Sequence, residues 1–192
     1  MSRFSIGLAL HVAAVYAALA LLAGPAHGAP LEPDPALQWT DLRKPGPATQ
    51  TFRRLWDDRL GPAAAQWTRS GHSGPLPAFT LHRTFNTLQG PVLVNLLFDM
   101  FDCELPANGR GGGLVARCPM RIVSTSSGGA SRVSTHEEVC LLHVIPEPGV
   151  PGPDPRDNFM TMRLEADRTL HISVVEFGKA VPSCERHIKV EP

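Results

Sequence analysis

Apolar and polar residues alternate with a period of two in a series of short segments along this chain of 192 residues. A period of two places successive side chains on opposite faces of a β-strand, and such segments separated by glycine and proline are typical of antiparallel sheets. The predicted strands cover residues 79–85, 92–103, 114–123, 133–145, 159–165, 170–177 and 184–190. We therefore expect a mainly β protein.

Residues 92–103 are apolar on both faces, which predicts a central strand that is covered by a helix or by a partner of its own sheet. A short buried helix is the alternative for this segment. Asp99 and Asp102 are three residues apart on the predicted strand, so we expect them to point to opposite sides and not to form an acid pair.

One amphipathic helix is predicted over residues 48–60, before the first strand. Its apolar stripe, at helical spacing, consists of Phe52, Leu55, Trp56 and Leu60. Gly61 and Pro62 predict the end of this helix, because glycine favours the conformation that terminates a helix and proline cannot continue it.

The chain has four cysteines, namely Cys103, Cys118, Cys140 and Cys184. An even number of cysteines in a chain that begins with an export signal, here residues 1–28, predicts two disulfides. Three pairings of the four cysteines are possible. We favour Cys103–Cys118, because both residues flank a glycine-rich turn, and Cys140–Cys184 then follows by elimination. The spacings lack the close cysteine pairs of structural zinc sites, so we expect no metal there. The predicted fold is a single antiparallel β-sandwich or curled sheet with one N-terminal amphipathic helix and two disulfides.

The N-terminus resembles an export signal in its charge and hydropathy. Arg3 is the only charged residue before Glu32, residues 6–23 are almost all apolar, and Ala26 and Gly28 are small. These features predict a secretory signal peptide over residues 1–28, with an uncleaved membrane anchor as the alternative. Residues 29–47 contain five prolines and are expected to form a flexible leader, and residues 48–192 a single disulfide-stapled β-rich domain. The expected location is secreted or periplasmic.

The charge composition excludes some partners. The chain has 18 basic and 18 acidic residues and no formal net charge, whereas nucleic-acid binding usually needs a basic surface. We therefore expect no nucleic-acid partner and no membrane insertion after signal cleavage. No phosphate-binding or dinucleotide motif occurs in the sequence, so no cofactor is expected.

Few residues have the pattern of a catalytic or metal site. The Gly71–Gly74 loop places His72 beside Ser73 but lacks the strand and spacing of a nucleophile motif, so no catalytic residue is assigned. His136 and Glu138 share a strand face if the alternation is regular, which would permit an acid–base pair. His171 and His187 would form a two-histidine surface site if their strands pair. These four residues are the alternative candidate site.

The loops at residues 105–113, 124–131 and 146–157 would present contact surfaces on a rigid sheet. We therefore expect an exported, non-enzymatic protein-binding domain, such as an envelope inhibitor or an immunity-type protein. The alternatives are an envelope hydrolase of unknown substrate and a structural or adhesive surface module.

Overall fold

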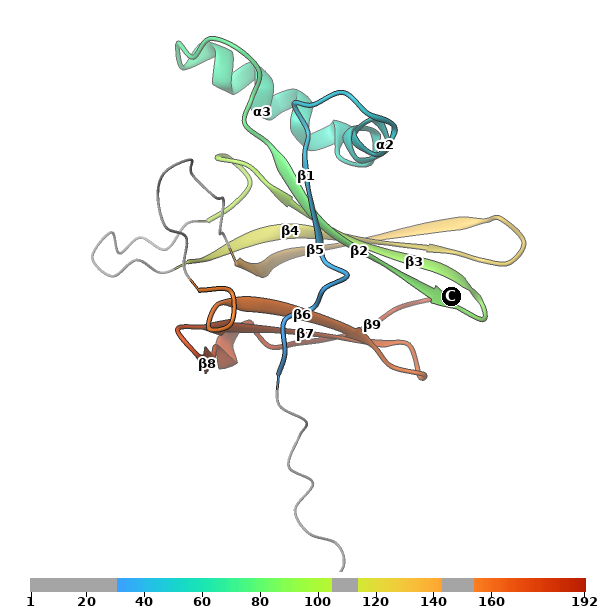
Figure 1. The fold of residues 1–192 in the computed structure, drawn as a ribbon. Helices are drawn as coiled ribbons and strands as arrows, with labels where there is room; N and C mark the ends of the chain where they lie inside the picture. The colour runs from blue at the N-terminus through green and yellow to red at the C-terminus, as the bar shows by residue number, and fades with distance from the viewer. Residues whose placement is uncertain (1–30, 105–113, 143–153) are drawn as a thin grey trace, which may run out of the picture. The chain divides into compact units, whose positions relative to one another are not determined.

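The computed structural model describes residues 31–104, 114–142 and 154–192, and this part of the chain is mainly β, with antiparallel sheets and two helices (Figure 1). The predicted signal peptide over residues 1–28 and the loop at 105–113 lie outside the described residues. The end of the strand predicted at 133–145 and most of the loop at 146–157 also lie outside them.

The first sheet is a five-stranded antiparallel meander in chain order, β1 to β5. Its strands are β1 (Gln38–Asp41), β2 (Phe79–Thr87), β3 (Gly90–Phe98), β4 (Val115–Thr125) and β5 (Ser131–Leu142). The central strand β3 is buried on both faces, which confirms the prediction from its apolar pattern. Leu96 belongs to the core that this sheet shares with the second sheet, and Leu97 belongs to the core beneath the helices.

The second sheet is built around its central strand, β7. Its strands are β6 (Phe159–Leu164), β7 (Thr169–Glu176), β8 (Lys179–Ala180) and β9 (Arg186–Lys189). β6 pairs with one edge of β7, and both β8 and β9 pair with β7 as well, all antiparallel. The β6–β7 hairpin confirms the hairpin predicted from residues 159–177. A short 3₁₀ helix, Pro182–Cys184, precedes β9.

The described residues contain two α-helices in the region where the sequence predicts one. They are α2 (Pro47–Leu55) and α3 (Asp57–Arg69), so the predicted end at Gly61 and Pro62 is wrong. The break lies at Trp56, whose side chain is fully buried and donates a 2.6 Å hydrogen bond from Nε1 to Asn95 on β3. This contact fixes the chain to the sheet, and a new helix begins directly after it. Pro62 removes one backbone hydrogen bond from α3, but strong helix-forming alanines follow it.

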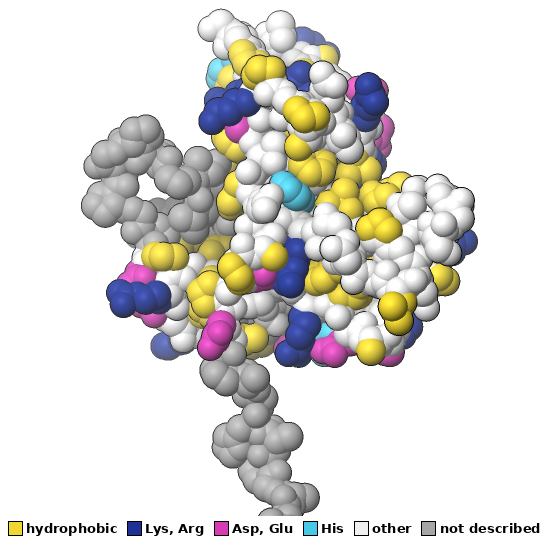
Figure 2. All heavy atoms as spheres, turned by 45° about the vertical axis from the view of Figure 1, so that its right-hand side comes forward, with side chains coloured by type: hydrophobic (Ala, Val, Ile, Leu, Met, Phe, Trp, Pro, Cys, Tyr) yellow, Lys and Arg dark blue, Asp and Glu magenta, His cyan; other side chains and the backbone are white. Residues whose placement is uncertain are grey.

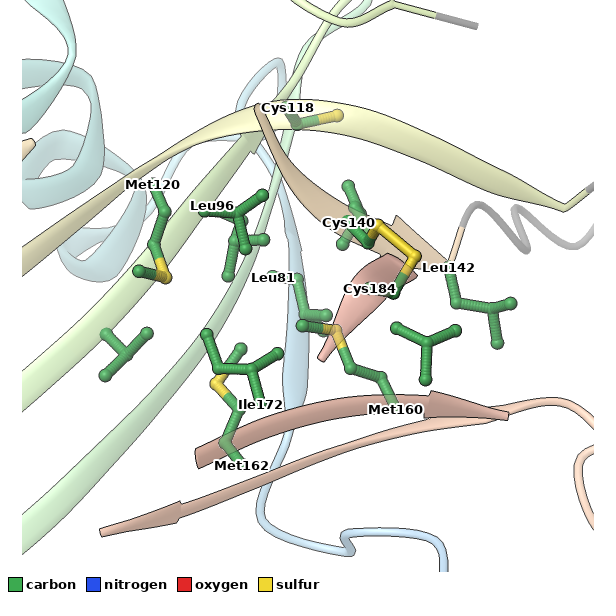
Figure 3. Packing of buried hydrophobic residues seen from close by; sticks show 14 of the residues in the cluster. Leu81, Leu96, Cys118, Met120, Cys140, Leu142, Met160, Met162, Ile172 and Cys184 are labelled. Atoms are coloured by element: carbon green, nitrogen blue, oxygen red, sulfur yellow. A yellow bond between two sulfur atoms is a disulfide. The ribbon is translucent and has the colours of Figure 1, made fainter. Parts of the chain in front are cut away.

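Buried apolar residues form two clusters, one on each face of the first sheet. The helices cover one face, where Phe52, Trp56 and Leu97 are buried, and the second sheet lies on the other face (Figure 1). The larger cluster joins the two sheets; in Figure 3 its side chains include Leu81, Leu96, Met120, Met160, Met162 and Ile172. Its members come from β2, β3 and β4 as well as from β6 and β7, so neither sheet buries its apolar face without the other.

Both predicted disulfides are formed, and they leave no free cysteine in the described residues. Cys103–Cys118 closes a sequence separation of 15 residues within the first sheet. Cys140–Cys184 connects the end of β5 to the 3₁₀ helix before β9, and both of its cysteines are buried in the shared core (Figure 3). This second bond is therefore a covalent link between the two sheets.

The proline-rich segment is attached to the sheets at several points from Leu31 onward. β1 pairs with β2, and Leu42 is buried. The carboxylate of Asp34 accepts hydrogen bonds from the Arg83 guanidinium on β2 and from the backbone N–H of Met162 on β6. No helix in the described residues combines the length and apolar character needed to cross a bilayer.

Candidate functional site

The most exposed large apolar side chain in the described residues belongs to Leu88, whose relative exposure is 105%. Leu88 and Gln89 form the two-residue turn between β2 and β3, a position that usually carries polar residues or glycine. The next residue, Gly90, has φ +119°, and a Cβ atom there would lie 1.9 Å from the carbonyl oxygen of Thr125 on β4. Glycine at 90 thus lets β4 pack close to the turn that presents Leu88.

The Leu88 turn borders an open hollow of about 530 Å³ between the β2–β3 turn and the β6–β7 turn. Apolar side chains in its lining come from Phe85, Leu88 and Leu164. The guanidinium of Arg83 lies 4.4 Å from the centre of the Phe85 ring. Aromatic and arginine side chains around an apolar centre are typical of protein interfaces. We refer to Leu88 and this hollow as the Leu88 surface.

Arg168 lies in the β6–β7 turn, on the side of the hollow opposite Leu88, and fixes the position of that turn. Its backbone has φ +66°, an uncommon conformation for a side chain of this size. Its guanidinium donates hydrogen bonds to the carbonyl oxygens of Val190 and Glu191, each at 3.0 Å, and to Oε1 of Gln89 at 2.8 Å. These bonds connect the β6–β7 turn to the β2–β3 turn and to the C-terminal residues, so the hollow is formed before any ligand binds.

The structure does not bring His136 and Glu138 together as a pair. The β4–β5 register shifts between Cys118 and Met120, because Glu137 and Glu138 of β5 together lie opposite Pro119 of β4, and Glu138 has φ +54°. This β-bulge interrupts the alternation on which the shared face depends. Nε2 of His136 lies 3.3 Å from the Ser134 hydroxyl, whereas the Glu138 carboxylate lies 4.0 Å from Arg117. Burial lowers the pKa of His136.

His171 and His187 do meet, because the two strands that carry them pair. They are direct cross-strand partners on β7 and β9, and their ring centroids are 4.2 Å apart. Neither histidine lines the Leu88 surface.

His72 of the Gly71–Gly74 loop stacks on the Trp67 ring at a centroid distance of 3.8 Å, which gives that imidazole a packing role beside α3.

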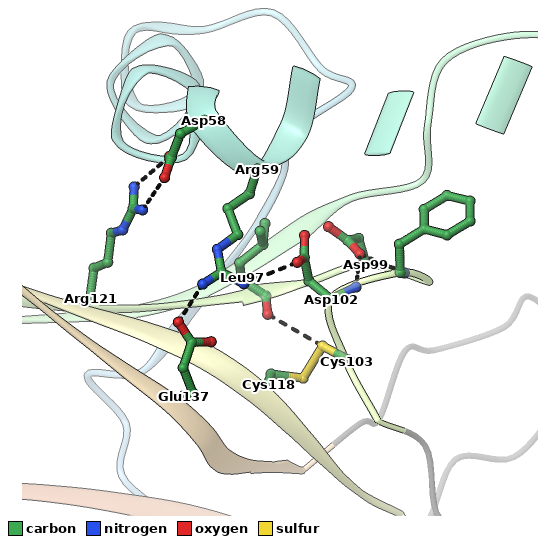
Figure 4. Close-up of polar contacts among 10 residues, drawn as sticks. Asp58, Arg59, Leu97, Asp99, Asp102, Cys103, Cys118, Arg121 and Glu137 are labelled. Atoms are coloured by element: carbon green, nitrogen blue, oxygen red, sulfur yellow. Dashed lines mark hydrogen bonds and ion pairs between the residues drawn. A yellow bond between two sulfur atoms is a disulfide. The ribbon is translucent and has the colours of Figure 1, made fainter. Parts of the chain in front are cut away.

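An acidic turn follows β3, and the expectation that Asp99 and Asp102 point apart is wrong. The strand ends at Phe98, so both residues lie in the turn, where they are drawn side by side in Figure 4. Oδ1 of Asp99 accepts the backbone N–H groups of Phe101 and Asp102, each at 2.7 Å. Arg59 of α3 then bridges the carboxylates of Asp102 and Glu137. Sequence spacing gives no signal for the contacts of Arg59, because Asp102 and Glu137 lie 43 and 78 residues from it in the chain.

Asp99 and Asp58 have pKa shifts of opposite sign. Burial raises the pKa of Asp99, and the negative charge of Asp102 raises it further. Hydrogen bonds from the Arg121 guanidinium, at 2.6 and 2.8 Å, lower the pKa of Asp58 (Figure 4). Because folding raises the pKa of Asp99, the protonated Asp99 side chain contributes stability that is fully present below the unfolded-state pKa of 3.8. This contribution is lost as the pH rises through the folded-state pKa of Asp99.

Replacement of Asp99 with asparagine is therefore expected to raise the melting temperature at pH 7, and this gain should shrink toward pH 4. Asparagine keeps an oxygen that can accept the two backbone N–H groups but carries no charge to desolvate. The matched control is Asp58→Asn, which should lower the melting temperature at pH 7 and lose its effect in acid. Thermal unfolding of both variants from pH 7 to below pH 3.8 measures how each change in melting temperature depends on pH, because the contribution of Asp58 is lost only below its unfolded-state pKa of 3.8. Changes that depend on pH in the same direction would contradict the prediction.

Polar and charged groups of the described residues are distributed over several separate clusters. On the face drawn in Figure 2, apolar side chains reach the surface at several separate places, with basic and acidic side chains between them. Within residues 31–104, 114–142 and 154–192, no group of three or more His, Cys, Asp or Glu side chains is arranged to hold a metal ion. Comparison with protein families, with curated proteins and with solved structures found no match to this chain.

Proposed function

We propose that this chain is exported, matures with both disulfides in an oxidising compartment, and binds a protein partner without catalysing a reaction. An inhibitor or an immunity-type protein of the cell envelope is the form of this function that we favour. The two disulfides support the compartment, because such bonds persist in secreted and periplasmic proteins.

The observation that carries the binding proposal is the full exposure of Leu88 beside a preformed hollow. Folding gains nothing from an apolar side chain that remains in water, so Leu88 keeps its full apolar surface available for burial against a partner. Such burial stabilises a complex, because interface energy is concentrated in a few apolar, aromatic and arginine anchors. The Arg168 hydrogen bonds hold the surface in one conformation, which lowers the entropy lost on binding.

Replacement of Leu88 with serine is expected to weaken capture of the partner by roughly tenfold or more, because the variant loses an interface anchor. The melting temperature should stay unchanged, because the side chain is already exposed. The measurement is quantitative affinity capture from an extract of the cell envelope, with the oxidised protein as bait and increasing bait concentration.

The control for this experiment is Val133→Ser on β5. Val133 is a half-exposed apolar residue that does not line the Leu88 surface. The control should bind as well as the unmodified protein does. Equal loss in both variants, or equal recovery by both, would contradict the assignment of the Leu88 surface. Hydrolysis of an envelope polymer in the absence of any captured protein would favour the hydrolase alternative.

A further inference from the structure

The outward face of the second sheet holds two histidines in direct contact. His171 on β7 and His187 on β9 are register partners, with ring centroids 4.2 Å apart and ring planes inclined by 45°. The flanking residues Leu170 and Ile172 are buried in the shared core, so the imidazoles project from the opposite face. The His187 side chain is 53% exposed, which leaves its ring accessible to a solute.

A carboxylate orients the second of these rings. Oε1 of Glu185 lies 3.1 Å from Nε2 of His187. An ionised carboxylate only accepts hydrogen bonds, so Nε2 is a protonated nitrogen, and in the neutral imidazole Nδ1 then carries the lone pair that a metal ion would use. A histidine that donates one ring N–H to a carboxylate while its other nitrogen is free is the arrangement found around metal-binding histidines.

The charged groups near the pair are compensated. Arg163 is the register partner of His171 on β6, and its Nε lies 3.0 Å from Glu165. Lys189 lies beyond His187 on β9, and its ammonium lies 3.1 Å from Asp167. Arg163 and Lys189, the two basic residues whose register places them on the same face as the pair, therefore each have a carboxylate partner, which weakens their repulsion of a cation. Arg186, on the other face of β9, bonds the backbone carbonyl oxygens of Ser183 and Glu185.

We propose that His171 and His187 bind one divalent transition-metal ion such as Zn²⁺, with Glu185 as a positioning residue and water in the remaining coordination positions. Imidazole nitrogens suit Zn²⁺ and Cu²⁺. Two nitrogens bound tetrahedrally to one zinc lie about 3.3 Å apart, a separation of the same order as the 4.2 Å between the two ring centroids. Two protein ligands leave open positions, so the ion would exchange readily. This proposal does not depend on the Leu88 surface.

The experiment is calorimetric titration of Zn²⁺ into the oxidised protein purified without a histidine tag. We expect one saturable site. His171→Gln and His187→Gln should each weaken binding by about tenfold or more, and Glu185→Gln by about tenfold, as loss of an orienting carboxylate does in known sites. The matched control is His72→Gln, which removes an imidazole that lies beside α3 and should leave zinc binding unchanged.

A second measurement keeps the proposal testable if a variant unfolds. Cu²⁺ binds such ligands more tightly than Zn²⁺, and its electron paramagnetic resonance spectrum in the unmodified protein should show coupling to two imidazole nitrogens. Zinc affinity that is the same in both histidine variants as in the unmodified protein would overturn the proposal. So would the lack of saturable binding up to about 1 mM Zn²⁺, because a site weaker than this contributes little free energy of binding.

Discussion

Removal of the Cys140–Cys184 disulfide by replacing both cysteines with alanine is expected to lower the free energy of unfolding by about 4 kcal/mol. In the chain-entropy model, a bond that closes a loop of 44 residues restricts the unfolded chain by this amount. Small domains have only about 5–15 kcal/mol of net stability, so the loss is a large part of the total. The bond also joins the first sheet to the second, and we expect the second sheet to unfold locally.

Urea unfolding and hydrogen exchange measure these two effects. Backbone amides of β6, β7 and β9 should exchange faster in the Cys140→Ala, Cys184→Ala variant, while those of β2, β3 and β4 stay protected. The control is the matching double replacement of Cys103 and Cys118, which opens a loop of 15 residues and should cost about 3 kcal/mol without selective exposure of the second sheet. Faster exchange of the second sheet in the control as well would show that the inter-sheet bond has no special role.

Replacement of Asp34 with alanine is expected to destabilise the fold by about 3 to 5 kcal/mol, the usual result of removing one partner of a buried ion pair. The Asp34 side chain is 6% exposed and that of Arg83 is 24% exposed. Arg83 also donates a hydrogen bond to the carbonyl oxygen of Met162, and Asp34 accepts the N–H of the same residue at 3.3 Å. Loss of the carboxylate leaves the guanidinium partly buried without its counter-charge and removes a polar link between the sheets.

The double variant Asp34→Ala, Arg83→Met tests the origin of this loss. Removal of the unpaired charge should recover part of the stability, because an apolar side chain has no charge to desolvate. The control is Glu191→Ala, which breaks an ion pair with Arg132 whose side chains are 61% and 69% exposed and should have little effect in urea unfolding. A double variant less stable than Asp34→Ala alone would contradict the buried-charge explanation.

Several elements were predictable because their signals are local. The alternation in residues 159–177 is a property of neighbouring residues, and it identified the β6–β7 hairpin. The disulfide between Cys103 and Cys118 followed from a glycine-rich segment between two strands. The apolar residues on both faces of β3 indicated its central position in the sheet.

The errors arose where distant residues decide the local conformation. Burial of Trp56 against Asn95 separates the helices and lets α3 continue past Pro62. The bulge of β5 at Glu137 and Glu138, opposite Pro119, changes which residues of β5 share a face and so separates His136 from Glu138. Arg59 lies beside Asp102 only because α3 packs over the first sheet.

The sequence by itself determined the mainly β class and the approximate positions of β2 to β7 and β9, and it favoured the observed pairing of the four cysteines, because side-chain alternation and turn composition act between near neighbours in the chain. It gave no signal for β1 or β8. Only the tertiary structure decided that Leu88 borders a hollow, that His171 lies against His187, and that Asp34 joins the two sheets. These contacts connect residues on different strands or segments, and their geometry depends on sheet register and on how the two sheets pack, which no short stretch of sequence specifies.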